Sequence, residues 1–305
     1  MSSEPRHVLV TGGAGFVGSH LCDRLVADGV RVSVLDNLSR GKREWVPEGV
    51  TIYEVDVRDG AGVAAVFADS RPDTVAHLAA LHFIPAVDNA PDLAEAINVG
   101  GTRNVLDAAR AHPPERLLFA STAAVYANLS EPLSEELAPA PIDLYGRTKL
   151  AGEHLVAAFA VDTGTRCILA RLFNVMGPRE TNPHILPEIV EQVRGGALEL
   201  ELGNLDPARD FVDARDVADA LLALLRNAEP GAVPYNVGTG RAVSVADIVR
   251  TCGEILGREI PVRQVPGRMR AIERAVLVAD VTRISAAVGW EAQRSFRNTL
   301  AELLA

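Results

Sequence analysis

The sequence predicts an α/β fold in which a doubly wound parallel sheet is followed by a smaller C-terminal lobe. Three observations support this fold class. Apolar runs alternate with helical patterns as far as Asn174, a glycine-rich turn follows the first apolar run directly, and Pro and Gly become more frequent beyond Asn174. Strands that alternate with helices indicate βαβ units with right-handed crossovers, and therefore a parallel sheet covered on both faces.

The expected elements follow from these patterns. The apolar runs predict buried strands at 6–11, 31–36, 50–57, 74–80, 116–122 and 166–174. The intervening helical patterns lie at 15–27, 60–69, 91–111 and 144–161. Beyond Asn174 we expect short strands at 198–202 and 234–238, and helices near 184–194, 214–226, 244–256 and 295–304. The chain should therefore form a Rossmann-type domain over 1–175 and a lobe over 176–305, with a segment at about 207–240 returning to the first domain.

The composition is that of a globular protein with an ample core, since 48% of the 305 residues are hydrophobic and 23% are charged. A formal net charge of -10 argues against a nucleic-acid partner, which would require a clustered basic face. No apolar stretch approaches the ~20 residues of a membrane span, and the N-terminus lacks a signal-peptide pattern, so we expect a cytoplasmic protein without membrane contact. The three cysteines and seven histidines show no metal-site spacing, so no metal is predicted.

The glycine-rich turn predicts a phosphate-binding site. The first strand runs directly into TGGAGFVG (11–18) and then into a helix. Glycines at 13, 15 and 18 allow a tight turn, close approach of the backbone to a pyrophosphate, and close packing of the helix on the strand. The N-terminus of the helix then offers free N–H groups and a partial positive charge to the phosphates. The strand before the turn and the helix after it favour dinucleotide binding over a mere packing turn.

Asp36 at the end of the second strand indicates which dinucleotide is bound. A carboxylate there can accept hydrogen bonds from the ribose hydroxyls of the adenosine, and it would repel a 2′-phosphate. This position favours NAD over NADP, although the nearby Arg40 and Lys42 could soften the preference.

Tyr145 and Lys149 are candidate catalytic residues. They are spaced i and i+4 in a predicted helix and therefore lie on one face of it. A free tyrosine has a pKa near ~10, so a tyrosine that acts as a base needs a nearby positive charge to stabilise the phenolate. Ser121 and Thr122 end a predicted strand, where ligands bind in an open α/β sheet. Their hydroxyls should therefore face the dinucleotide.

The chain resembles the extended short-chain dehydrogenase/reductase family, and within it the nucleotide-sugar epimerases and dehydratases. The segments that carry the resemblance extend over nearly the whole length: TGGAGFVG (11–18), DNLSRG (36–41), HLAA (77–80), INVGGT (97–102), STAAVY (121–126), YGRTK (145–149), RLFNVMGPR (171–179), RDFVDARDVA (209–218) and YNVGTG (235–240).

The resemblance implies roles for individual residues. Tyr145 would be the base, Lys149 would orient the ribose and lower the pKa of Tyr145, and Thr122 would hydrogen-bond the reacting sugar oxygen. Asp56 and Val57 would contact adenine. The other expected contacts to NAD come from Gly12, Gly13, Gly15, Phe16, Val17, Gly18, Asp36, Asn37, Leu78, Ala79, Ala80 and Asn98. The expected contacts to a nucleotide sugar come from His82, Thr122, Asn174, Arg209 and Arg270, the last three at positions that hold the pyrophosphate in relatives.

Ala123 and Ala124 indicate which reaction of the family is expected. Relatives that eliminate water carry an Asp-Glu pair directly after the threonine, and relatives that decarboxylate UDP-glucuronate carry Glu at the position of Ala124. Alanines cannot move protons, so the remaining Thr, Tyr and Lys predict a 4-epimerase. Such an isomerase removes a hydride from C4 of a nucleotide sugar, UDP-linked by resemblance, holds a 4-keto sugar, and returns the hydride to the other face.

Two alternatives remain at this stage. The same three residues could serve a reductase of 4-keto sugars, although Asp36 disfavours the NADPH on which biosynthetic reductases draw. A non-catalytic scaffold that binds NAD is a further alternative, because a fold alone does not establish catalysis. Relatives usually pair as homodimers through two helices, for which the helices near 91–111 and 144–161 are the candidates.

Overall fold

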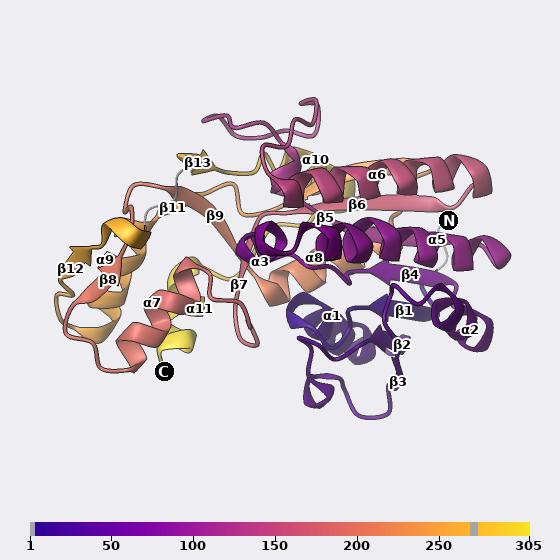
Figure 1. The fold of residues 1–305 in the computed structure, drawn as a ribbon, viewed down its shortest axis with the longest axis horizontal. Coiled ribbons are helices and arrows are strands. Elements are labelled where there is room, and N and C mark those ends of the chain that lie inside the picture. Colours follow the sequence, from indigo (N-terminus) through magenta and orange to yellow (C-terminus); the bar gives the residue numbers. More distant parts are fainter. Residues whose placement is uncertain (1–3, 269–273) are drawn as a thin grey trace.

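In the computed structural model, which describes residues 4–268 and 274–305, seven parallel strands form one twisted sheet (Figure 1). The strands are, in spatial order, β10 (Ala232–Val237), β6 (Arg166–Leu172), β5 (Arg116–Thr122), β4 (Thr74–His77), β1 (His7–Thr11), β2 (Arg31–Asp36) and β3 (Thr51–Glu54). The order reverses between β1 and β4, so the first two crossovers lead one way along the sheet and the later ones lead the other way. This is the doubly wound α/β fold that the sequence predicted.

Helices cover both faces of this sheet. On one face lie α1 (Phe16–Ala27) and α8 (Ala214–Arg226). On the other lie α2 (Gly60–Ser70), α5 (Gly101–Ala111) and α6 (Leu144–Thr163). Before α5 the chain passes through α3 (Ile84–Asn89), α4 (Pro91–Glu95) and a π-helical segment at Ala96–Gly100, so the helix predicted at 91–111 is present with one wider turn inside it.

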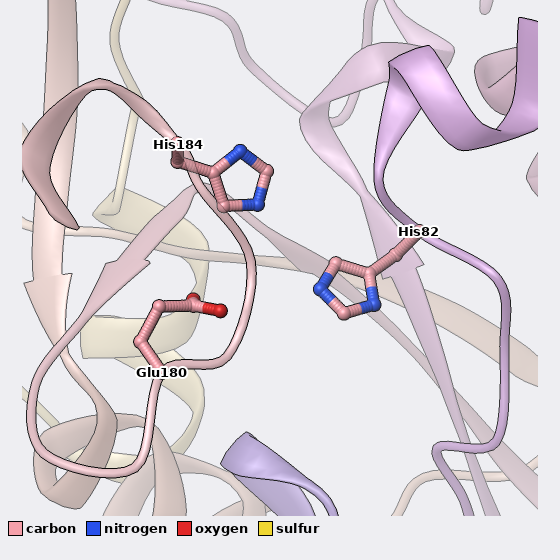
Figure 2. A group of neighbouring side chains, drawn as sticks. All are labelled: His82, Glu180 and His184. Atoms are coloured by element: carbon pink, nitrogen blue, oxygen red, sulfur yellow. The ribbon is translucent and has the colours of Figure 1, made fainter. Parts of the chain in front are cut away.

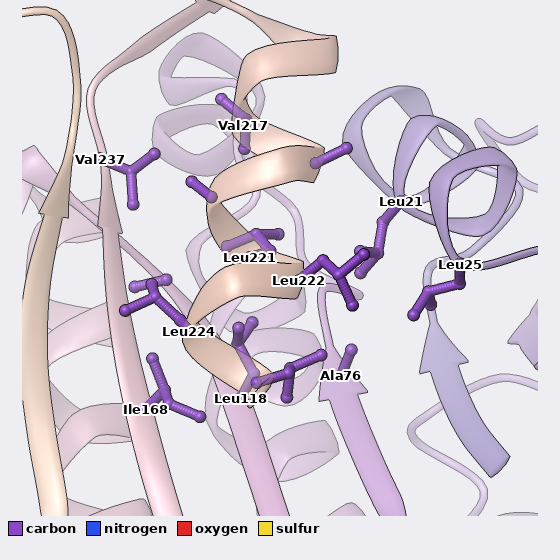
Figure 3. Packing of buried hydrophobic residues seen from close by; sticks show 14 of the residues in the cluster. Leu21, Leu25, Ala76, Leu118, Ile168, Val217, Leu221, Leu222, Leu224 and Val237 are labelled. Carbon is purple, nitrogen blue, oxygen red and sulfur yellow. The ribbon is translucent and has the colours of Figure 1, made fainter. Parts of the chain in front are cut away.

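The alternation of side chains along the strands divides the core into two layers. In β1, Val8 and Val10 belong to the cluster under α1 and α8, whereas Leu9 belongs to the cluster under α2, α5 and α6. Figure 3 shows the first cluster, in which leucines of α1 and α8 pack over Ala76 and Leu118 of the sheet. Because both faces of the sheet are buried, the sequences of its strands are continuous apolar runs and not alternating patterns.

The smaller lobe packs beside the carboxyl ends of the large sheet (Figure 1). Its helices enclose a separate apolar cluster and are α7 (Ile185–Arg194), α9 (Val245–Leu256) and α11 (Phe296–Leu304). Its strands are β7 (Asn174–Met176), β8 (Leu200–Leu202), β9 (Ala208–Asp213), β11 (Ala242–Ser244), β12 (Val262–Gln264) and β13 (Val276–Leu277). The remaining elements are spread along the chain. Helix α10 (Thr282–Val288) precedes α11, and short 3-10 turns lie at Arg43–Trp45, Ala123–Val125 and Pro266–Arg268.

Several predicted strands are shorter than expected, among them β8, which begins at Leu200. β3 ends at Glu54 and β4 at His77, because the residues that follow them turn into loops at the carboxyl edge of the sheet. The run predicted at 166–174 is interrupted at Phe173, and β7 then pairs with β9 of the smaller lobe instead of extending β6. The segment from β9 to β10 leaves the smaller lobe, contributes α8 to the core, and adds β10 beside β6. The division at residue 175 stays a prediction.

No helix among residues 4–268 and 274–305 combines the length and apolar character that crossing a bilayer requires.

Candidate active site

A cavity of about 2120 Å³ lies between the carboxyl ends of the large sheet and the smaller lobe. Its walls include the turn after β1, the end of β5, the start of α6, and residues of β9 and α7. Sites for one small molecule usually measure ~300–1,000 Å³, so this cavity has room for two such ligands side by side. The position is where open α/β sheets bind ligands.

The turn from β1 into α1 forms one end of the cavity. Gly15 precedes the first residue of α1, and Gly12 adopts a left-handed backbone with φ 70. Gly12, Gly15, Phe16, Val17 and Gly18 line the cavity, as the sequence predicted for a pyrophosphate cradle. Gly13 does not, because it faces β2, where an added Cβ would lie 2.6 Å from the Val34 side chain. Gly13 thus packs against β2, and its expected contact with NAD stays a prediction.

Gly18→Ala should damage the cradle. A Cβ at this position would lie 2.1 Å from the Gly12 carbonyl oxygen, so α1 must move away from the turn. We expect a loss of about 1–3 kcal/mol in the free energy of unfolding and a Kd for NAD at least tenfold weaker, measured by urea denaturation and calorimetry. Gly100→Ala is the matched control, because its added Cβ meets nothing closer than 3.9 Å. An unchanged affinity for NAD in Gly18→Ala would contradict this account of the cradle.

Asp36 and Asp56, which the sequence analysis assigned to the adenosine of NAD, both line the cavity. The Asp36 carboxylate accepts hydrogen bonds from the backbone N–H groups of Ala14 (3.0 Å) and Leu38 (2.8 Å), and burial raises its pKa. The Asp56 carboxylate accepts from Arg58 at 2.9 and 2.7 Å, and this contact holds its pKa well below the usual range. These bonds orient both carboxylates, and both line the cavity together with the expected contacts Asn37, Val57, Leu78, Ala79 and Ala80.

Asp36→Asn should weaken the discrimination between NAD and NADP. The substitution removes the negative charge that would repel a 2′-phosphate, while Arg40 remains in the cavity wall. Lys42 is turned toward Glu44, 3.8 Å away, and lies over the Trp45 ring. We expect the ratio of the Kd for NADP to the Kd for NAD to fall at least tenfold, measured by calorimetry. Asp59→Asn, which alters the cap of α2 outside the cavity, should leave that ratio unchanged; an equal effect of both variants would refute the role of Asp36.

Thr122, Tyr145 and Lys149 meet in the middle of the cavity wall. Asp143 caps α6 by accepting from the Gly146 N–H at 2.7 Å, which places Tyr145 in the first turn and Lys149 one turn further on. The side chain of Thr122, at the end of β5, hydrogen-bonds the Tyr145 phenol. The Lys149 ammonium is buried and lies 4.3 Å from the centre of the Phe119 ring. The structure thus brings together the three residues predicted to be catalytic.

Burial dominates the electrostatics of this group. Burial raises the pKa of Tyr145 above its ordinary value, and the hydrogen bond from Thr122 opposes that shift only in part. Burial also lowers the pKa of Lys149 to about 7, against the stabilising charge of Glu153. Of the surrounding groups, the Thr122 hydrogen bond lowers the pKa of Tyr145, and the lowering that the resemblance implied for Lys149 stays an expectation. A phenolate here requires further positive charge, such as that of an oxidised nicotinamide ring.

Glu153 lies one turn beyond Lys149 and belongs to a buried polar cluster. Its carboxylate accepts two hydrogen bonds from the Arg171 guanidinium, at 2.9 and 2.7 Å, and one from the Ser121 hydroxyl at 2.5 Å. Arg171 also donates to the Tyr126 hydroxyl at 3.0 Å. The cluster therefore connects α6 with β5, β6 and the turn after Thr122, next to the catalytic group.

Asn98 hydrogen-bonds the loop after β4 and helix α6. Its side-chain amide accepts from the Leu81 N–H at 2.7 Å and donates to the Leu81 carbonyl at 2.9 Å and to Thr148 at 3.0 Å. These bonds hold the loop after β4 against α6. Asn98 is buried and is not among the residues that line the cavity, so its expected contact with NAD stays a prediction.

The expected substrate residues lie at the other end of the cavity. His82, Asn174 and Arg209 line it, from the loop after β4, from β7 and from β9 respectively. Arg270 lies outside the described residues. The sequence analysis missed Arg274, which also lines the cavity and donates to the carbonyls of Tyr126 (2.8 Å) and Ala127 (3.0 Å). A lone arginine gave no signal in the sequence, because its partners are backbone atoms far along the chain.

Glu180 and His184 are further residues that the sequence did not indicate. Both lie in the loop between β7 and α7, and both face His82 across the cavity wall (Figure 2). One ligand atom of each of the three side chains lies within 4.8 Å of the others. Sequence spacing could not reveal this group, because His82 comes from a loop far from the other two in the chain.

Comparisons with known proteins agree with this fold and site. The family described as "NAD dependent epimerase/dehydratase family" matches residues 8–238, and the chain belongs to that family. A UDP-glucose 4-epimerase of Streptomyces lividans is 34% identical over 94% of this chain and 92% of its own length. The crystal structure of a Thermus thermophilus UDP-glucose 4-epimerase in complex with NAD superimposes with a TM-score of 0.90 at 34% identity, covering 98% of this chain and 97% of that one. A GDP-6-deoxy-D-mannose reductase of Pseudomonas aeruginosa is 31% identical over 98% of this chain and 96% of its own length.

The family and these relatives confirm the predicted family, the Rossmann-type fold and the cofactor NAD. They also agree with the predicted epimerase activity, since epimerases are similar to this chain over nearly its whole length.

Proposed function

We propose that the chain is an NAD-dependent 4-epimerase of a nucleotide sugar, and that the nucleotide is uridine diphosphate. The observation that carries the proposal is the group of Thr122, Tyr145 and Lys149 in a cavity with room for a dinucleotide and a nucleotide sugar. Ala123 and Ala124 follow Thr122 and offer no acid or base for elimination. The epimerases among the relatives act on UDP-sugars by name, which supports the choice of nucleotide.

Each residue of the site has its own role in the proposed reaction. Bound NAD supplies the hydride acceptor and donor for C4 of the sugar. The phenolic oxygen of Tyr145 accepts the proton of the C4 hydroxyl and later returns it, while Thr122 hydrogen-bonds the same region. The buried Lys149 ammonium stabilises the phenolate from the same face of α6. Arg209 in β9 supplies positive charge for a pyrophosphate, so the sugar can turn while its nucleotide stays bound.

The test uses purified protein without added cofactor. It is incubated separately with UDP-glucose, UDP-glucuronate, UDP-N-acetylglucosamine and dTDP-glucose, and sugar isomers are separated by chromatography. We expect a C4 isomer of at least one UDP-sugar, with no net change in NADH absorbance. If no sugar is isomerised and a supplied 4-keto sugar is instead reduced with stoichiometric loss of NADH, the proposal is wrong and the protein is a reductase.

We also propose a cytoplasmic homodimer. The helices from α4 to α6 supply the candidate interface. Val161 of α6 is 86% exposed and Leu93 of α4 is 40% exposed, so a second copy would remove apolar surface from water. Light scattering should give twice the mass of one chain, and Val161→Asp should shift it toward the monomer. A monomeric mass for the unchanged protein would contradict the pairing.

A further inference from the structure

We propose that His82, Glu180 and His184 form a binding site for a divalent transition-metal ion of the Zn²⁺ class in the wall of the substrate cavity. Their ligand atoms lie within 4.8 Å of one another. Figure 2 shows the Glu180 carboxylate and the two imidazole rings directed toward a common space. The proposal goes beyond the proposed function and departs from the sequence analysis, which predicted no metal.

The ligand set matches the chemistry of such ions. Two imidazole nitrogens and one carboxylate bind Zn²⁺ in catalytic zinc sites, and they also bind other first-row divalent ions. Three protein ligands leave at least one coordination position for water or for an oxygen of a bound molecule. All three side chains line the cavity that contains Thr122 and Tyr145, so that position is accessible from the substrate space.

Asn182 lies between two of the proposed ligands. Its side-chain nitrogen is 2.9 Å from Nε2 of His82 and 3.4 Å from Oε1 of Glu180. Nε2 of His82 therefore faces the loop that contains Glu180 and His184, and an ion bound there would replace the Asn182 amide as its partner.

The loop that supplies the other two ligands is fixed in place. Glu180 Oε1 accepts from the backbone N–H groups of Thr181 and Asn182, both at 2.8 Å, which orients the carboxylate. Just before it, Arg179 has a left-handed backbone with φ 70 and is held by Asp23 of α1 at 2.7 Å. His184 immediately precedes the first turn of α7, so the helix fixes the position of its backbone. The ligands are thus presented by an ordered loop.

The test is a direct measurement of metal binding that requires no turnover. The full chain, freed of any polyhistidine tag and dialysed against a chelator, is titrated with Zn²⁺ in a calorimeter. We expect one ion per chain, with Co²⁺ giving visible d–d bands at the same stoichiometry. His82→Ala, Glu180→Gln and His184→Ala should each weaken the Kd for Zn²⁺ at least tenfold. In Glu180→Gln the amide oxygen can still accept from the loop N–H groups, so the loop should keep its conformation.

His112→Ala is the matched control, because His112 is exposed and does not line this cavity. Its Kd for Zn²⁺ should equal that of the unchanged protein, and all variants should keep their affinity for NAD. The proposal is overturned if the unchanged protein binds no Zn²⁺, or if the three variants bind it as tightly as the control does. Neither result would affect the proposed epimerase, whose test measures sugar isomers.

Discussion

Tyr145→Phe should reduce the turnover of the UDP-sugar by about 10²- to 10⁴-fold while the protein still folds and binds NAD, because the substitution removes only the oxygen that exchanges a proton with the sugar. The Thr122 hydroxyl would lose its hydrogen-bond partner, but Thr122 also accepts from the Ala124 N–H at 3.2 Å and stays in place. The measurement is kcat from the chromatographic assay, together with calorimetric affinity for NAD.

Tyr53→Phe is the matched control for that experiment. Tyr53 lies in β3 and donates its hydroxyl to Asp69 at the surface, away from the cavity. Removal of the Tyr53 hydroxyl should leave kcat within about a factor of two of the value for the unchanged protein, since surface substitutions rarely change a site that they do not touch. A fully active Tyr145→Phe protein would eliminate the proposed mechanism, whatever the control shows.

Glu153→Ala should produce the largest loss of stability, about 3–5 kcal/mol in the free energy of unfolding. Glu153 and Arg171 are each only 4% exposed, and the substitution leaves the Arg171 guanidinium buried without its carboxylate partner. Breaking a buried ion pair from one side costs this much because the remaining charge is desolvated and uncompensated. Urea denaturation monitored by circular dichroism would measure the loss.

Glu254→Ala provides the comparison. Glu254 also accepts from two arginines, Arg250 and Arg297, both at 2.8 Å, but all three side chains are about half exposed. Exposed pairs contribute only ~0–1 kcal/mol, so we expect a small change. Equal effects of the two substitutions would show that burial does not determine the cost, and would contradict the argument for Glu153.

Much of the site could be predicted from the sequence because its signals are local. The turn at 11–18 requires small residues at particular positions, and the spacing of Tyr145 and Lys149 places them on one face of a helix wherever that helix packs. The role of Asp36 was predicted from its position at the end of a strand. These features depend on backbone geometry within a few residues, and the structure places most of the turn, Asp36, Tyr145 and Lys149 in the cavity wall.

Other features depend on neighbours from distant segments. The sequence did not indicate that Gly13 packs against β2 or that Asn98 bonds the loop at Leu81, because these partners lie far along the chain. The strand after β6 could not be assigned to the right sheet, because its apolar run continues while its partner changes from β5 and β10 to β9.

Apolar periodicity and short spacings act within single elements, so they were enough to predict the α/β class, the parallel sheet, the glycine turn and the Tyr-Lys pair. The electrostatics and the long-range assemblies depend instead on how these elements pack. Burial of Tyr145 and Lys149 shifts both pKa values against the charged forms, which no spacing can reveal. The approach of His82 to Glu180 and His184 likewise depends on how the loop after β7 packs on α1, a contact between residues far apart in the chain.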